Sequence, residues 1–282
     1  MNLIQLVKAV FLVSLCTGNR SRIPVLRYED SWVCVNKPAG LTVHKSDDRR
    51  SHGVTLRSSL KRQLARKVLP VHRLDHRTSG AIVFAFDSET AGSLHDALAR
   101  GTKDYIAIVR GIWRHQDPFV VDEPLNVKGV KKEAATKFSL LASSTESDDF
   151  PFSILRCQPL TGRTHQIRRH AYHAGHPIIG DSQHGDSRVN RQWRTNRGLD
   201  RMGLHCLEIK LDGVDGACVA PLSPELRTVL EARTSVWELA VERDPRLALE
   251  QIDLRGGTFG RNYRNRRATE APHVENEEAV PG

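Results

Sequence analysis

The pattern of apolar and polar positions along this 282-residue chain predicts many short strands and few helices. Within residues 25–35 the alternation is interrupted once, at residues 28–31, which predicts two strands joined by a tight turn. Further strands are predicted at 81–86, 103–111, 136–141, 154–158, 204–211 and 217–220. Because the strands do not alternate regularly with helices, we expect an α+β fold built on a largely antiparallel sheet.

Helical spacing of apolar residues predicts four helices, at 54–67, 88–101, 164–174 and 224–233. The first is amphipathic, and its basic residues lie on the solvated side. Ser88 is expected to cap the second helix and Gly101 to end it, while Gly175 ends the third. Residues 112–135 show no periodicity and are expected to be irregular.

The two ends of the chain differ in composition from its middle. Residues 3–15 form an apolar run that is too short to span a bilayer. We expect residues 1–22 to be an extension outside the fold; a secretory signal is the alternative, although no basic segment precedes the run. Residues 246–282 are Gly- and Arg-rich and then acidic, which predicts disorder. Residues 23–245 are therefore expected to form a single folded domain.

Composition and charge narrow the class of partner. Lys and Arg number 42 against 33 Asp and Glu, so the net charge is +9, which suits a polyanion without proving one. The five cysteines are scattered and form no C-x-x-C pair, so we expect reduced thiols and a cytoplasmic protein. We expect no membrane association, no obligate protein partner and a monomer.

The most informative chemistry lies at residues 71–80, immediately before a predicted buried strand. Asp75 is flanked there by Arg73, His76 and Arg77, and neighbouring positive charge favours an ionised carboxylate. A nucleophile or a base requires that ionised form. An ordinary salt-bridged loop aspartate would show the same local pattern.

The sequence His-Arg-Leu-Asp at 72–75, followed by Thr-Ser-Gly at 78–80, resembles the signature of the RluA-type pseudouridine synthases. Other blocks resembling that family follow its order at 36–40, 103–107, 135–138, 160–168 and 204–205. The resemblance covers about residues 23–230. It implies the pseudouridine synthase catalytic fold, a mixed sheet with flanking helices around a central RNA-binding cleft.

The resemblance also implies roles for individual residues. Asp75 would attack the target uridine, either at the base or at the anomeric carbon. Arg73 would fill the space left by the everted nucleotide, since chemistry on a base requires its removal from the stack. Tyr105 would stack on the uracil and assist proton removal at C5, and Arg168 would pair with Asp75. The remaining residues expected to bind RNA are Lys37, His72, Arg77, Thr78, Arg163, His165 and Gln166.

Helix geometry agrees with part of this assignment without reference to the family. On a helix beginning at Thr164, His165, Arg168 and Tyr172 share one face and could line a polar cleft. A solvated helix face would show the same spacing.

We expect neither a metal nor a cofactor. Histidines gather at 165, 170, 173 and 176, but their spacing fits no zinc motif. The sequence also has no phosphate-binding loop and no dinucleotide fingerprint.

The RNA substrate is predicted from one segment. Residues 176–191 are longer than in most relatives and resemble the tRNA pseudouridine synthase C branch, whose target is tRNA uridine 65. We also expect no small RNA-binding module before residue 23, which favours tRNA over large-subunit rRNA, the alternative substrate. The arginines at 255–267 are either an RNA contact or a solvated tail.

Two rival functions remain at this point. One is a catalytically silent RNA-binding protein on the same fold, and the other is a hydrolase that uses Asp75 with a histidine.

Overall fold

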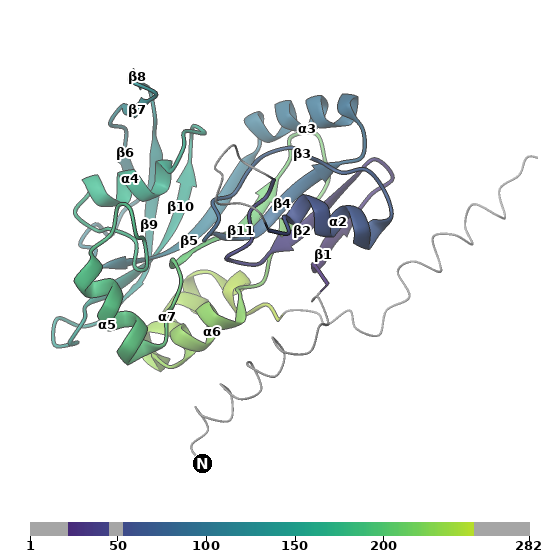
Figure 1. The fold of residues 1–282 in the computed structure, drawn as a ribbon. Helices are drawn as coiled ribbons and strands as arrows, with labels where there is room; N and C mark the ends of the chain where they lie inside the picture. Colours follow the sequence, from purple (N-terminus) through teal and green to yellow (C-terminus); the bar gives the residue numbers. More distant parts are fainter. Residues whose placement is uncertain (1–21, 45–52, 251–282) are drawn as a thin grey trace, which may run out of the picture. The chain divides into compact units, whose positions relative to one another are not determined.

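A ten-stranded sheet organises the part of the chain that the computed structural model describes, residues 22–44 and 53–250 (Figure 1). Its strands follow the order β1-β2-β4-β11-β5-β10-β9-β6, with β3 paired to β4 and β12 paired to β11. The strands are β1 (Val25–Tyr28), β2 (Trp32–Lys37), β3 (Leu69–Pro70), β4 (Ser79–Ala85), β5 (Thr102–Arg110), β6 (Phe119–Val121), β9 (Thr136–Ser143), β10 (Phe152–Pro159), β11 (Leu204–Lys210) and β12 (Cys218–Val219). A separate hairpin joins β7 (Leu125–Val127) to β8 (Val130–Lys132).

Helices cover both halves of this sheet. They are α2 (Leu56–Leu64), α3 (Ser88–Arg100), α4 (Gln166–His173), α5 (Ser187–Arg197), α6 (Pro224–Glu231) and α7 (Thr234–Arg243), followed by the 3-10 turn η1 (Pro245–Ala248). Helix α3 lies beside β3 and β4, whereas α4 contacts β9 and β10 (Figure 1). None of the helices among the described residues combines the length and the apolar character that a membrane span requires.

The centre of the sheet is its one parallel pairing among the described strands, β4 with β11. Ser79 lies opposite His205, and Gly80 lies opposite Cys206. Gly80 has a φ of +114°, and a Cβ at this position would lie 2.2 Å from the carbonyl oxygen of Cys206. Only glycine fits, so the position combines an unusual backbone conformation with a close approach of two strands.

Two hydrophobic clusters stabilise the sheet, and strands β5, β10 and β11 contribute residues to both. The first packs α2 and α3 against β2 and β4, with Leu56, Leu94 and Phe84 buried. The second lies under β10 and includes Trp193 of α5, whose ring meets Phe152 edge-on at 5.1 Å. Strand β5 lies in the middle of the sheet, between β11 and β10.

The predicted α+β class and the largely antiparallel sheet are confirmed, and so is the hairpin of β1 and β2. The predicted irregularity of residues 112–135 is wrong, because β6, β7 and β8 lie there. Each of these strands is three residues long, too short for alternation to be recognised.

Several predicted helix boundaries also need correction. Helix α3 is capped by Asp87, whose side chain accepts a hydrogen bond from Thr90, and not by Ser88. Helix α4 begins at Gln166 because His165 adopts a left-handed conformation with a φ of +54°. Helices α5 and α7 were not predicted.

The fold continues beyond the predicted domain end at residue 245. Leu247 is fully buried, and Arg246 forms ion pairs with Asp104 and Glu208. Residues 1–21 and 251–282 lie outside the described residues, and with them the predicted N-terminal extension and most of the predicted tail.

Replacing Gly80 with alanine tests the central strand pairing. The new Cβ would clash with the Cys206 backbone, so Gly80→Ala should lower the free energy of unfolding by about 3 kcal/mol or more. Chemical denaturation measures the change. The matched control is Gly92→Ala on the exposed face of α3, where a Cβ meets nothing within 4 Å. The control should raise stability by about 0.5–1 kcal/mol, and an equal effect of both substitutions would contradict this interpretation.

Candidate functional site

The loop that carries Asp75 lies directly before β4 and is fixed by hydrogen bonds on both sides. His72 Nε2 accepts the N–H of Val83 at 3.1 Å, and the N–H of Thr78 donates to the Asp75 carbonyl at 3.0 Å. Leu74 is buried and anchors the loop in the first hydrophobic cluster. The carboxylate of Asp75 remains 22% exposed, so the loop presents a reactive oxygen on an otherwise immobile support.

A buried lysine holds the other side of this loop. The Nζ of Lys37 donates to the carbonyls of Pro38, Leu41 and His76, at 2.9, 2.8 and 3.2 Å. The side chain is fully buried, and burial lowers its pKa to about 7. Three acceptors require all three N–H groups of the ammonium form. Lys37 therefore holds the backbone next to Asp75 in place through these three hydrogen bonds.

Arg168 of α4 reaches Asp75 from the opposite half of the sheet. Its Nη1 donates to Asp75 Oδ2 at 2.8 Å. Its Nε and Nη2 donate to the two oxygens of Asp181, at 2.6 and 2.8 Å, in a bidentate pair. The guanidinium is thus oriented by Asp181 and offers one remaining edge to Asp75.

Asp181 is the residue that orients Arg168, and its side chain is completely buried. The N–H groups of Gln183 and His184 donate to its Oδ1, at 2.9 and 3.1 Å. Burial opposes ionisation, but the hydrogen bonds from Arg168 and from these backbone groups lower the pKa of Asp181 below its ordinary value. Asp181 therefore remains a carboxylate beneath the arginine.

Tyr105 lies on β5, with only 8% of the residue exposed. Burial, the neighbouring Cys206 and the charge of Asp75 raise the pKa of the phenol well above its ordinary value. The ring is therefore a neutral, hydrogen-bonding surface next to Asp75 at physiological pH.

Two histidines stand beside the Asp75 carboxylate. Nε2 of His165 lies 3.8 Å from Asp75 Oδ1, and its Nδ1 lies 3.3 Å from His184 Nε2. Burial lowers the pKa of both rings, so both are neutral at physiological pH. His165 occupies its place because its backbone is left-handed at the start of α4.

Of the arginines in the predicted RNA-binding set, Arg73 is exposed, whereas Arg77 and Arg163 are partly buried. The side chain of Arg73 lies two residues before Asp75 in the same loop. Arg77 donates to the Asp200 carbonyl at 2.9 Å, and Arg163 donates to the Glu133 carbonyl at 2.9 Å.

The buried members of that set do not fit an RNA contact, and the prediction is wrong for Lys37 and Gln166. Gln166 is 4% exposed, and its amide bonds to Thr161, Arg163 and Ala135, which shapes the start of α4. Thr78 is 2% exposed. His72 is neutral, since burial lowers its pKa to about 3, and its Nε2 accepts the Val83 bond described above.

Sequence reasoning missed a second buried network behind the loop. Arg201 donates to Ser79 Oγ at 2.9 Å, and Ser79 Oγ lies 2.7 Å from His205 Nδ1. His205 Nε2 lies 2.9 Å from the Ala220 carbonyl, so it is the protonated nitrogen and Ser79 donates to Nδ1. The network ties the start of β4 to β11.

The predicted face of α4 is only partly correct. Arg168 points to the site, but Tyr172 is 55% exposed and does not line it. In the described ranges, no three His, Cys, Asp or Glu side chains lie close enough to hold a metal. His170, for example, bonds to Thr136 Oγ1 and to the Glu123 carbonyl.

Comparison with known proteins gives this arrangement a family. A family model described as RNA pseudouridylate synthase matches residues 31–173, the segment that includes Asp75, Tyr105 and Arg168. The chain belongs to this family. It is an RNA pseudouridine synthase of the RluA type, an isomerase that acts on RNA.

Relatives and solved structures agree with that assignment. The tRNA pseudouridine synthase C of Vibrio parahaemolyticus is 36% identical over 65% of this chain and 82% of its own, and that of Vibrio vulnificus is 32% identical over 77% and 93%. The ribosomal large subunit pseudouridine synthase C of Pasteurella multocida is 36% identical over 73% and 66%. The structure of human RNA pseudouridylate synthase domain containing 1 matches with a TM-score of 0.58 and 25% identity, over 73% of this chain and 85% of its own.

The orienting role of Asp181 in the synthase is testable by substitution. Asp181→Asn removes the charge that holds the Arg168 fork, so the single-turnover rate of pseudouridine formation should fall about 100-fold. Stability should also fall, by about 3 kcal/mol, because a buried arginine loses its partner.

A matched variant separates these two effects. Asp148 pairs with the buried Arg197 away from the site, so Asp148→Asn should lower stability and leave the single-turnover rate unchanged. A rate lost equally in both variants would contradict an orienting role for Asp181.

Proposed function

We propose that this synthase isomerises a uridine of tRNA, of the position-65 type, and that Asp75 is its nucleophile. The observation that carries the proposal is the ion pair of Asp75 with Arg168, at 2.8 Å, on a carboxylate that remains partly exposed. The reaction breaks the N1–C1′ bond, rotates the uracil and forms a C5–C1′ bond. The C5 proton leaves and N1 is reprotonated, so no oxidant or reductant is consumed.

The environment of Asp75 suits a nucleophile and not an acid. Arg168 donates directly to its Oδ2 and keeps the charged form oriented. The adjacent His165 is neutral and so does not compete for that charge. Attack at the base and attack at the anomeric carbon both require this ionised carboxylate, and both routes remain open.

Arg73 fits the role of filling the stack after the nucleotide leaves it. Its side chain is exposed, whereas the residues on both sides of it are tied to the fold. A flexible cation on a fixed loop can enter an RNA helix while Asp75 stays in place.

The environment of Tyr105 supports stacking over proton transfer. Its pKa is raised, so the phenolate that would accept the C5 proton is disfavoured. A neutral aromatic ring remains suited to packing against a uracil.

Similarity supports tRNA as the substrate. The Vibrio enzymes named tRNA pseudouridine synthase C match over 82% and 93% of their own length. The segment 176–191, which resembles that branch, folds into a loop and the first part of helix α5 beside the catalytic pair. The ribosomal relative is equally identical, at 36%, so large-subunit rRNA is the second candidate.

Complementation with pseudouridine mapping tests both the substrate and the nucleophile. In cells lacking the gene, the wild-type protein should restore one pseudouridine in tRNA, and Asp75→Asn should restore none. Asp75→Asn should bind that RNA at least as tightly as the wild type, because the substitution removes a negative charge that faces a polyanion. Restoration of an rRNA site alone would replace tRNA by rRNA, and product formed by Asp75→Asn would refute the nucleophile.

Two substitutions at Tyr105 separate stacking from proton transfer. Tyr105→Phe keeps the ring and should retain single-turnover activity within about 10-fold, whereas Tyr105→Leu should lose about 100-fold. If both variants lose activity equally, the hydroxyl is required and the stacking role is insufficient.

A further inference from the structure

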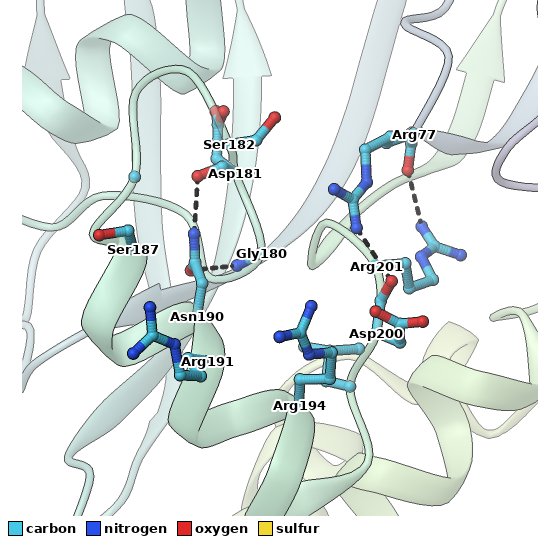
Figure 2. Close-up of a pocket in the computed structure, with 12 residues that line it drawn as sticks. Arg77, Gly180, Asp181, Ser182, Ser187, Asn190, Arg191, Arg194, Asp200 and Arg201 are labelled. Carbon is cyan, nitrogen blue, oxygen red and sulfur yellow. Dashed lines mark hydrogen bonds between the residues drawn. The ribbon is translucent and has the colours of Figure 1, made fainter.

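A basic pocket adjoins the pair formed by Asp75 and Arg168. It has a volume of about 280 Å³ and lies between Arg77, the loop of residues 180–185, helix α5 and residues 199–201 (Figure 2). Figure 2 shows Arg194 extending from α5 into the space between Asn190 and Arg77, and Arg191 beside Asn190. None of the roles assigned above uses Arg191 or Arg194.

The α5 residues of the pocket share one helix face. Ser187, Asn190, Arg191 and Arg194 follow the spacing i, i+3, i+4 and i+7. Arg191 and Arg194 are exposed, and neither side chain has a hydrogen bond or ion pair with any residue in the ranges 22–44 and 53–250. Two adjacent guanidinium groups thus lack anionic partners within the described fold.

Two other side chains of α5 explain how the helix is held without these arginines. Trp193 is 1% exposed and packs on Phe152, and Arg197 pairs with Asp148. Arg191 and Arg194 are therefore not needed to dock the helix. Their placement calls for a ligand rather than a packing role.

The acidic groups of the pocket do not neutralise these arginines. Both oxygens of Asp181 are occupied by Arg168. Asp200 is exposed, and its carboxylate has no ion pair with a described residue. Four arginines face two aspartates in the lining, so the pocket keeps an excess of positive charge.

Hydrogen bonds fix the pocket relative to the reacting carboxylate. Asn190 Oδ1 accepts the N–H of Gly180 at 2.6 Å, and its Nδ2 donates to the Asp181 carbonyl at 2.7 Å (Figure 2). The Asp181 side chain in turn holds Arg168. On the other wall, Arg77 is two residues from Asp75 in the same loop.

We propose that this pocket binds a backbone phosphate of the substrate RNA beside the everted nucleotide, through Arg77, Arg191 and Arg194. Guanidinium groups match phosphate oxygens in two-pronged hydrogen bonds, and the pocket is large enough for one phosphate group. Such a contact carries no base information but sets the register of the strand. The proposal rests on the proposed position of the target uridine at Asp75.

Salt dependence of RNA binding tests the site. We compare Arg191→Gln and Arg194→Gln with Arg188→Gln, an exposed arginine on the same helix that does not line the pocket. Each pocket variant should raise the Kd for the RNA that the wild type converts by about 5- to 20-fold. Each should also reduce the slope of log K against log salt by about 0.7–0.9. Arg188→Gln should change Kd less than about 2-fold.

Neutral phosphate analogues locate the contact. One methylphosphonate linkage is placed in turn at each phosphate around the target uridine. One position should weaken wild-type binding and have no further effect in the Arg191→Gln/Arg194→Gln double variant. Additive losses at every position would overturn the proposal.

Replacement of Asp200, the exposed carboxylate in the pocket wall, should change the affinity for RNA in the opposite direction. Asp200→Asn should tighten RNA binding by about 2- to 3-fold, because it removes a negative charge from the wall of a phosphate site. Weaker binding in this variant would count against the pocket.

The remaining outcomes distinguish the sources of the phosphate and the two proposals. The arginine variants could bind RNA like the wild type but lose the rise in Tm that inorganic phosphate or UMP gives the wild type. In that case the ligand is a free anion, and the RNA contact is refuted. The same samples are assayed for pseudouridine. Product from Asp75→Asn would refute the nucleophile, while an unchanged slope in the arginine variants would refute only the phosphate site.

Discussion

The site depends on one arginine that is shared by two carboxylates. Arg168 presents one edge of its guanidinium to the buried Asp181 and its remaining Nη1 to Asp75. Because Asp181 occupies two donors in fixed geometry, the third donor has a defined direction. A lysine at this position would supply charge without that direction. The carboxylate of Asp75 is therefore oriented by an arginine that the fully buried Asp181 holds in place.

This arrangement explains the way in which the fold brings the site together. Asp75 precedes β4, Tyr105 lies on β5, and Arg168 lies on α4 after β10. The parallel contact of β4 with β11, made possible by Gly80, joins the loop of Asp75 to the strand beside β5. Lys37 and the network of Arg201, Ser79 and His205 lock that junction from behind. The buried cations thus serve the geometry of the loop.

Much of the fold and the centre of the site could be predicted from the sequence. The long strands β4 and β5 have continuous apolar runs, and the resemblance at residues 72–80 and 160–168 predicted the pairing of Asp75 with Arg168, which lie 2.8 Å apart. Helix α5 could not be found, since Trp193 is its only buried residue and its remaining sequence is polar. Lys37 was misassigned because lysines are rarely buried, and no local pattern reveals three converging carbonyls. Asp181 was missed because its partner Arg168 lies across a turn, beyond the reach of helical spacing.

A structure of the Asp75→Asn variant bound to its substrate RNA would test the central claim most directly. The account predicts an everted uridine within van der Waals contact, about 4 Å, of the side chain at position 75, with Arg168 still paired to Asp181 and Arg73 in the gap left in the RNA. A target uridine that stays stacked in its helix, or that docks away from residue 75, would contradict it.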